Sequence, residues 1–126
     1  IFLYYEDDDM CLRIRKAGFS LVLVPNSVVV HFNGGSVRPN RAYYWEKFWH
    51  LAWSRIYIEG KYRGTVAKTV LAIRLGMRFA CKAMGNGISG RHHKCWRDTA
   101  RFAGTCSALF GVRVARKDLA DATITT

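Results

Sequence analysis

The sequence of 126 residues has four cysteines but no Cys-x-x-Cys pair, and it has no long apolar run. Without that cysteine spacing, neither a disulfide framework nor a structural zinc site, which needs four ligands, is supported. The longest uncharged apolar stretches, residues 19–30 and 69–73, are too short or too interrupted to span a bilayer. These shortages favour a reduced, cytoplasmic setting, and we expect no part of this sequence to cross a membrane.

Acidic residues are also scarce, nine against 20 basic ones, and they are unevenly placed. Residues 1–36 hold four acids and three bases, whereas residues 37–126 hold five acids and 17 bases, a net charge of +12. The basic part is expected to meet an anionic group: a phospholipid headgroup, a nucleotide or sugar phosphate, or a nucleic acid. The two parts are therefore expected to have different functions.

Half of the residues are hydrophobic, which is enough for one domain to bury a packed core. The sequence opens on an apolar and aromatic run, residues 1–5, of the kind found in a buried segment that is already under way. We therefore expect a C-terminal fragment of a longer protein, in which these five residues expose apolar surface.

An acidic run at residues 6–9, the bases that follow it and Gly18 predict a short helix that begins near Asp7. Two β-branched segments come next. They predict an antiparallel or mixed pair of strands over residues 19–31, with a turn at Pro25. This part of the sequence is therefore expected to combine helix and strand.

Apolar spacing after Asn40, the expected helix entry, predicts a helical region. The predicted helices cover residues 41–59, 65–84 and 95–110, with Gly60 ending the first, a loop at residues 85–90 and a polar tail from residue 112. No internal repeat is present. The region from residue 39 onward is therefore expected to be mainly α-helical.

Two helical faces in this region each have two readings. The first is aromatic and consists of Trp45, Phe48, Trp49 and Trp53. It is either part of the core or a surface for the membrane interface. The second is basic and consists of Arg74, Arg78 and Lys82. It is either a solvated face or a contact for anionic lipid.

Four adjacent carboxylates at residues 6–9 repel one another, so their presence side by side requires an explanation. One reading is an acidic helix N-terminus, where each charge contributes roughly a few tenths of a kcal/mol. The other is a general base held near a divalent cation, because carboxylates at a helix start are well placed to take a proton from a hydroxyl. The four acids alone leave both readings open.

The wider context of the four acids resembles a known family. The run Phe-Leu-Tyr-Tyr-Glu-Asp-Asp-Asp-Met-Cys-Leu-Arg is followed by Arg-Lys-Ala-Gly-Phe and by Val-Pro-Asn-Ser-Val-Val-Val-His-Phe-Asn-Gly-Gly-Ser. Together these segments resemble the end of the catalytic domain of family 2 glycosyltransferases. The resemblance implies an α/β fold, with residues 1–38 as the C-terminal end of a GT-A (nucleotide-diphospho-sugar transferase) domain. Residues 39–126 would be a helical extension with basic, aromatic-rich faces.

Carried over residue by residue, the resemblance implies that Asp7 is the catalytic base that deprotonates the acceptor hydroxyl in a transfer with inversion. Glu6 would be its neighbour in the motif, and Asp9 would orient the acceptor or the helix start. His31 matches a histidine that helps to hold a divalent metal, Mn²⁺ or Mg²⁺, on the nucleotide diphosphate. A histidine that ends an apolar strand is by itself more often a packed polar residue, so the ligand role depends on the resemblance.

The implied partners are a nucleotide-sugar donor and a glycan or lipid-linked acceptor. An anionic membrane surface is a further expected partner, which would place the protein peripherally at the inner face of the membrane. The family's separate Asp-x-Asp metal motif and nucleotide pocket are not in this sequence, so the fragment alone is expected to be inactive.

The alternative is a basic membrane-surface or nucleic-acid-binding helical module without catalysis. No recognised nucleic-acid-binding motif occurs in the sequence, and the four acids would oppose phosphate. No nucleic acid is therefore expected as a partner. A helical module without chemistry would leave the arrangement of residues 6–9 and 31–36 unexplained.

Overall fold

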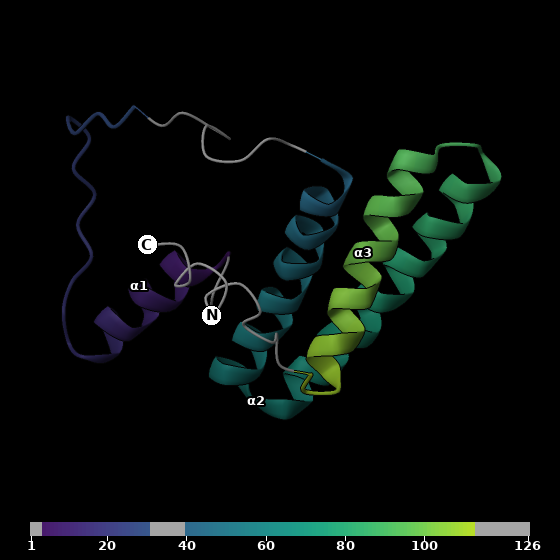
Figure 1. The fold of residues 1–126 in the computed structure, drawn as a ribbon. Coiled ribbons are helices and arrows are strands. Elements are labelled where there is room, and N and C mark those ends of the chain that lie inside the picture. The colour runs from purple at the N-terminus through teal and green to yellow at the C-terminus, as the bar shows by residue number, and fades with distance from the viewer. Residues whose placement is uncertain (1–3, 31–39, 113–126) are drawn as a thin grey trace, which may run out of the picture.

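A computed structural model describes residues 4–30 and 40–112, and every regular element within these ranges is a helix (Figure 1). Helix α1 spans Glu6–Lys16, α2 spans Arg41–Ile88 and α3 spans His92–Leu109. The predicted α/β fold, with the end of a GT-A sheet in residues 1–38, is therefore wrong for the described part of the chain. In the same part, none of the helices has the length and apolar character needed to cross a membrane.

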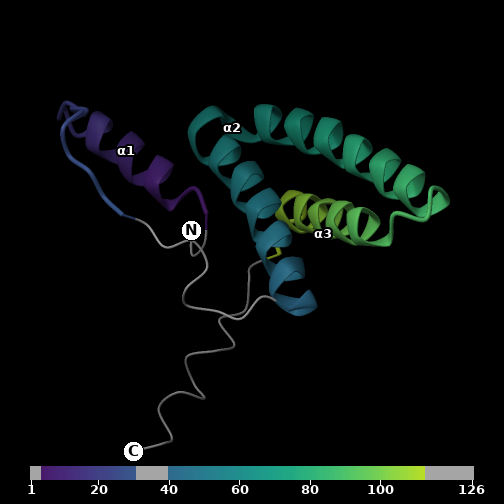
Figure 2. The same cartoon turned by 90° about the horizontal axis from the view of Figure 1, so that it is seen from above.

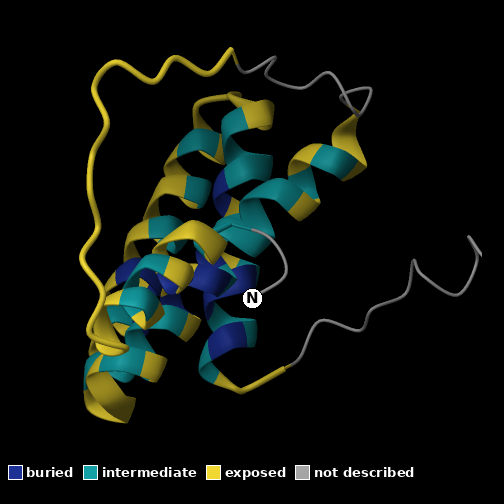
Figure 3. Cartoon of the chain, turned by 90° about the vertical axis from the view of Figure 1, so that its left-hand side faces the viewer, coloured by how far each residue is buried: buried dark blue, intermediate teal, exposed yellow. Residues whose placement is uncertain are grey.

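The predicted strand pair is wrong where it can be seen, because residues 19–24 and 28–30 form no ladder. The predicted turn between them is confirmed: the amide of Ser27 donates to the carbonyl of Val24 at 3.1 Å. The whole segment is exposed (Figure 3). β-branched residues favour a strand only where a neighbouring strand and a buried face receive them. The described residues supply neither.

Helix α1 has the boundaries and the charge pattern that the sequence predicts. All four acids lie in its first turn and Arg13, Arg15 and Lys16 lie in its last, as the helix dipole favours. Gly18, with φ of +87°, ends it in the left-handed conformation that glycine adopts without steric cost. Of the five residues expected to expose apolar surface, Tyr4 and Tyr5 are half-buried and the first three lie outside the described residues.

Helix α2 begins where the sequence predicts and ends elsewhere. The side chain of Asn40 accepts a hydrogen bond from the amide of Tyr43 at 2.7 Å, which is a typical N-cap. The helix passes through Gly60 and bends at Gly64, where φ is 86° and ψ is 175°. The prediction that Gly60 ends this helix is therefore wrong. We call residues 41–63 the N-terminal arm and residues 65–88 the C-terminal arm.

The predicted loop at residues 85–90 is largely helical, since α2 continues to Ile88. A tight turn at Ser89 and Gly90, with φ of +66° at the glycine, then reverses the chain into α3. The third predicted helix is confirmed and begins three residues earlier than expected, at His92. The polar tail falls almost wholly outside the described residues.

The core lies where α3 packs against both arms of α2 (Figures 1 and 2). Its centre consists of Ile56, Ala72, Leu75 and Ala108. Trp53, Leu71, Phe79 and Leu109 surround it. Each arm and α3 contribute to this cluster, so the three segments stabilise one another by burying the same apolar surface.

The aromatic face of the N-terminal arm is half-buried and makes contacts with α3. The ring of Trp45 lies 4.7 Å from that of Trp96 in α3, and the guanidinium of Arg101 lies 4.7 Å from the ring of Phe48. The indole nitrogen of Trp53 donates to the carbonyl of Val112 at 3.0 Å. These contacts favour the core interpretation of this face, and Trp53 packs directly against the core cluster.

At Gly104 of α3 two helices approach each other closely. A Cβ atom at this position would overlap the backbone carbonyl of Trp49 in the N-terminal arm. Residue 104 is itself buried. Only a residue without a side chain lets the two backbones come this close, which fixes how α3 sits on α2.

We expect Gly104→Ala to lower the free energy of unfolding by about 1–3 kcal/mol, because the added methyl group must push α3 away from the N-terminal arm. Gly85→Ala is the matched control, since the same methyl group at this helical position meets nothing within 4 Å. It should raise the free energy of unfolding by up to about 1 kcal/mol. Urea denaturation of both variants measures the difference, and equal stabilities would contradict the close packing.

Candidate functional site

The four acids of the predicted site are divided by the structure into two groups. Glu6, Asp7 and Asp8 are exposed, whereas Asp9 is 8% exposed and lies against α2. The predicted catalytic base is thus on the solvent side of α1. Asp9, two residues after Asp7, faces the protein.

Asp9 fixes α1 to the N-terminal arm through two side chains of that arm, Lys61 and Tyr62, and also pairs with Arg13 within α1. One carboxylate oxygen accepts hydrogen bonds from the amine of Lys61 at 2.5 Å and from the hydroxyl of Tyr62 at 2.7 Å. Its other oxygen lies 3.3 Å from the guanidinium of Arg13. The hydrogen bond from Lys61, followed by that from Tyr62, lowers the pKa of Asp9 below its ordinary value. The position of the exposed acids therefore depends on this buried one.

We expect Asp9→Asn to release α1 from the N-terminal arm. Hydrogen bonds to a charged group contribute about 1.5–3 kcal/mol, so amide hydrogen exchange over residues 6–16 should become at least about tenfold faster. Asp8→Asn removes an equal charge from an exposed position and should leave exchange unchanged. Similar effects of the two substitutions would contradict the anchoring role.

The same contact predicts a pH dependence. Because the pKa of Asp9 is lowered in the folded state, the contact is fully stabilising above the ordinary aspartate range. It is lost as the pH falls through the lowered pKa. Acidification should therefore loosen α1 in the parent chain, whereas α1 of Asp9→Asn should be loose at every pH. Exchange of the same amides, measured across a pH series and corrected for intrinsic rates, checks this.

No described side chain forms a hydrogen bond or ion pair with Asp7. Its carboxylate is therefore accessible to a hydroxyl group that approaches from solvent. Glu6 is exposed as well, and it is one cause, after burial and Tyr43, of the raised pKa of Tyr4. Chemically, an exposed carboxylate on an anchored helix can accept a proton.

A cationic cavity lies beside the start of α1. It has a volume of about 220 Å³, and Tyr5, which directly precedes the acidic run, contributes to its wall. Its cationic lining consists of Arg55, Arg78, Lys82 and Arg101. The apolar lining comes from Leu51, Ala52, Leu75 and Phe79. Four cations around one cavity make it suited to an anionic group.

The Arg101 side chain in this cavity is crowded by other cations. Burial is the main cause that lowers the pKa of its guanidinium, and the neighbouring charges of Arg97 and Arg78 lower it further. Asp98 acts in the opposite direction. A bound anion would relieve this repulsion between like charges.

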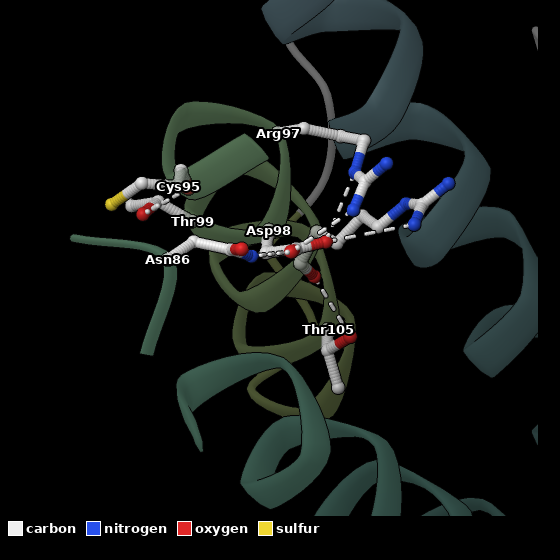
Figure 4. Close-up of polar contacts among 7 residues, drawn as sticks. Asn86, Cys95, Arg97, Asp98, Thr99 and Thr105 are labelled. Atoms are coloured by element: carbon white, nitrogen blue, oxygen red, sulfur yellow. Dashed lines mark hydrogen bonds and ion pairs between the residues drawn. The ribbon is translucent and has the colours of Figure 1, made fainter. Parts of the chain in front are cut away.

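Asp98 is fully buried and joins α3 to the end of α2 (Figure 4). Its carboxylate accepts hydrogen bonds from the Arg97 guanidinium at 3.1 Å and from the Asn86 amide at 3.0 Å. The Arg101 guanidinium lies 3.7 Å away. The sequence reasoning missed this residue. No sequence signal pointed to it, because an Asp beside an Arg in a helix is ordinarily a surface pair and Asn86 was expected in a loop.

We expect Asp98→Asn to lower the free energy of unfolding by about 3–5 kcal/mol, because it leaves two partly buried guanidinium groups without their carboxylate. Glu59→Gln is the matched control, since Glu59 pairs at 2.8 Å with Arg63, whose side chain is 72% exposed. Such a pair contributes at most about 1 kcal/mol. Thermal or urea unfolding of both variants decides, and comparable losses would contradict the buried network.

The predicted metal ligand His31, and the Gly-Gly-Ser that follows it, lie outside the described residues. Among residues 4–30 and 40–112, no three His, Cys, Asp or Glu side chains come together in a way that could hold a metal ion.

Comparison with known proteins adds no family: no family model, no curated protein and no solved structure matches the chain. The resemblance to family 2 glycosyltransferases thus rests on residues 2–36 and stays a prediction.

Proposed function

We propose that this chain is the part of an inverting glycosyltransferase, related to family 2, that carries the catalytic base. The observation that carries the proposal is the exposed carboxylate of Asp7 on a helix whose start is anchored by Asp9. The sequence pattern of residues 2–36 supports it. The proposal concerns the chemistry alone and does not include an α/β fold for the described residues.

In the proposed reaction, Asp7 accepts the proton of an acceptor hydroxyl group. The hydroxyl oxygen forms a bond to the anomeric carbon of the donor sugar, while the bond from that carbon to the nucleotide diphosphate breaks. Attack on the face opposite the leaving group inverts the configuration. An oriented general base contributes typically about 10²–10⁴-fold to such a step.

The cations that line the cavity favour a substrate that carries phosphate. The proposed nucleotide-sugar donor carries phosphate, and so does a lipid-linked acceptor. A glycan acceptor would react with the same phosphate-bearing donor. Tyr5 contributes to the wall of the cavity and stands two residues before Asp7, so the proposed base is close in sequence to a residue that lines the cavity. Glu6 is the proposed neighbour of the base, and Asp9 is the residue that positions it through α1.

A divalent metal, Mn²⁺ or Mg²⁺, belongs to the proposal through the resemblance, with His31 as one ligand. Such an ion would take up negative charge on the leaving diphosphate. The described residues offer no group of ligands for it, and none of the steps given above is routed through it.

We expect Asp7→Asn, in the full-length natural protein that contains this sequence, to lower kcat for sugar transfer by about 10²–10⁴-fold. Donor affinity should stay nearly unchanged, because the amide has the size of the carboxylate but cannot accept the proton. Asp8→Asn is the control with the same charge change on the same exposed helix turn. Measuring transfer and donor binding for the parent and both variants tests the proposal.

Two results would contradict it. Full activity of Asp7→Asn would remove the base role from this residue, and equal losses in both variants would point to charge rather than proton transfer. A parent protein that transfers no sugar from any nucleotide donor would favour the alternative, a basic helical module without catalysis. The purely helical packing of residues 40–112 is the observation that favours this alternative.

A further inference from the structure

The C-terminal arm of α2 carries an exposed apolar stripe. Its members recur at intervals of three and four residues, which places them on one side of the helix. They are Val66, Val70, Ile73, Met77, Cys81, Met84 and Ile88. Their exposed fractions run from 51% at Ile73 to 90% at Ile88, and Cys81 is exposed as well.

The stripe is distinct from the face that packs against α3. Ala72, Leu75 and Gly76 of the same arm are buried, and a Cβ atom on Gly76 would touch Phe102 and Thr105 of α3 at ordinary contact distance. The arm therefore has one apolar face inside the core and a second one outside it. No part of the described chain buries the second face, although an apolar surface of this extent usually marks an interaction site.

A row of cations borders the stripe. Arg74, Arg78 and Lys82 each follow a stripe residue by one position, and all three are exposed. Residues 65–88 hold four basic residues and no acidic one. The partner of this face must therefore be apolar along a line and negatively charged beside it.

The cationic cavity opens among the same side chains. Arg78 and Lys82 line it together with Arg55 and Arg101, and its volume is about 220 Å³. This volume and charge suit a phosphate group with part of what it is esterified to. Two of the cations that follow stripe residues, Arg78 and Lys82, thus also line a site suited to a single phosphate.

We propose that the C-terminal arm docks on an anionic phospholipid surface, with its apolar stripe in the acyl boundary and its cations on the headgroup phosphates. A second copy of the chain is disfavoured as the occupant, because pairing two such arms brings eight cations together without an acid. Nucleic acid is disfavoured because it would leave the apolar stripe in water. A bilayer surface satisfies both features, as it does for other amphipathic helices with basic flanks.

Binding of the 126-residue chain to vesicles tests the proposal. Vesicles of phosphatidylcholine alone are compared with vesicles of an equimolar mixture of phosphatidylcholine and phosphatidylglycerol, by sedimentation. We expect binding to the mixed vesicles only, and weaker binding as salt is added.

The apolar part of the surface is tested by Val70→Glu. This change should weaken vesicle binding by about tenfold or more, because the proposal places the Val70 side chain in the acyl boundary, where a charge is unfavourable. Val24→Glu is the matched control. It makes the same change at a valine of nearly equal exposure, 60% against 62%, that lies outside α2. Both side chains face solvent in the folded chain, so both variants should keep their helices, which circular dichroism checks. Equal losses would move the contact to the apolar segment 19–30 and overturn the proposal.

The basic part is tested by the double variant Arg74→Gln with Arg78→Gln. Each cation removed should weaken binding to the mixed vesicles by about fivefold. Arg15→Gln with Arg91→Gln is the control, since it removes the same charge from exposed positions outside α2. If both doubles bind equally weakly, net charge alone drives binding, which contradicts a docking face.

Two further measurements separate the other occupants. Titration with pyrophosphate asks whether the cavity takes a soluble phosphate. Pyrophosphate binding without vesicle binding would overturn the proposal. Light scattering of the chain in solution asks about a second copy, and a dimer that Val70→Glu dissociates would overturn it too. The proposal is independent of sugar transfer, because Asp7→Asn lies outside the docking face and should bind vesicles like the parent.

Discussion

The arrangement of the helical part depends on the approach of α3 to the N-terminal arm at Gly104. With no side chain there, the backbones come together, and the ring of Trp45 packs at a tilt against that of Trp96. The same approach brings the C-terminal arm onto the other side of α3, which closes the cluster around Ile56. It also carries Asp98 into the interior, where only nearby guanidinium and amide groups make a buried carboxylate tolerable. Backbone contact, apolar burial and internal charge pairing are thus consequences of one small residue.

Two of the few acids of the chain, Asp9 and Asp98, pair with cations that hold its helices together. Asp9 forms ion pairs with Lys61 and Arg13, and Asp98 forms ion pairs with Arg97 and Arg101. With nine acids against 20 bases, most cations have no acid with which to pair. These cations gather beside the cavity and along the C-terminal arm. Because acids are scarce, the surface keeps many cations that can bind anions. Both the sugar-transfer proposal and the membrane proposal depend on these cations.

Helix positions could be predicted from the sequence because apolar spacing and the Asn40 cap are local signals. The strands could not, because whether residues 19–30 pair depends on a partner strand and not on their own composition. Nothing local distinguishes Gly60 from Gly64 as a helix end either. At the site, the acidic run was found, but the sequence could not show that Asp9 faces Lys61 while Asp7 faces water. Asp98 was missed because an Asp next to an Arg in a helix looks like an ordinary surface pair.

The bend at Gly64 has a consequence for how the chain remains a single folded unit. A straight α-helix of 48 residues would be a rod about 70 Å long, with its two halves pointing away from each other. Helix α3 could then cover only one of them, and the apolar side of the other would have to find the α3 of a second molecule. Because Gly64 alone among residues 41–88 leaves the helical conformation, its left-handed φ makes the difference between folding back and exchanging helices with a neighbour. The backbone conformation of Gly64 therefore lets one α3 contact both arms of α2 within the same chain.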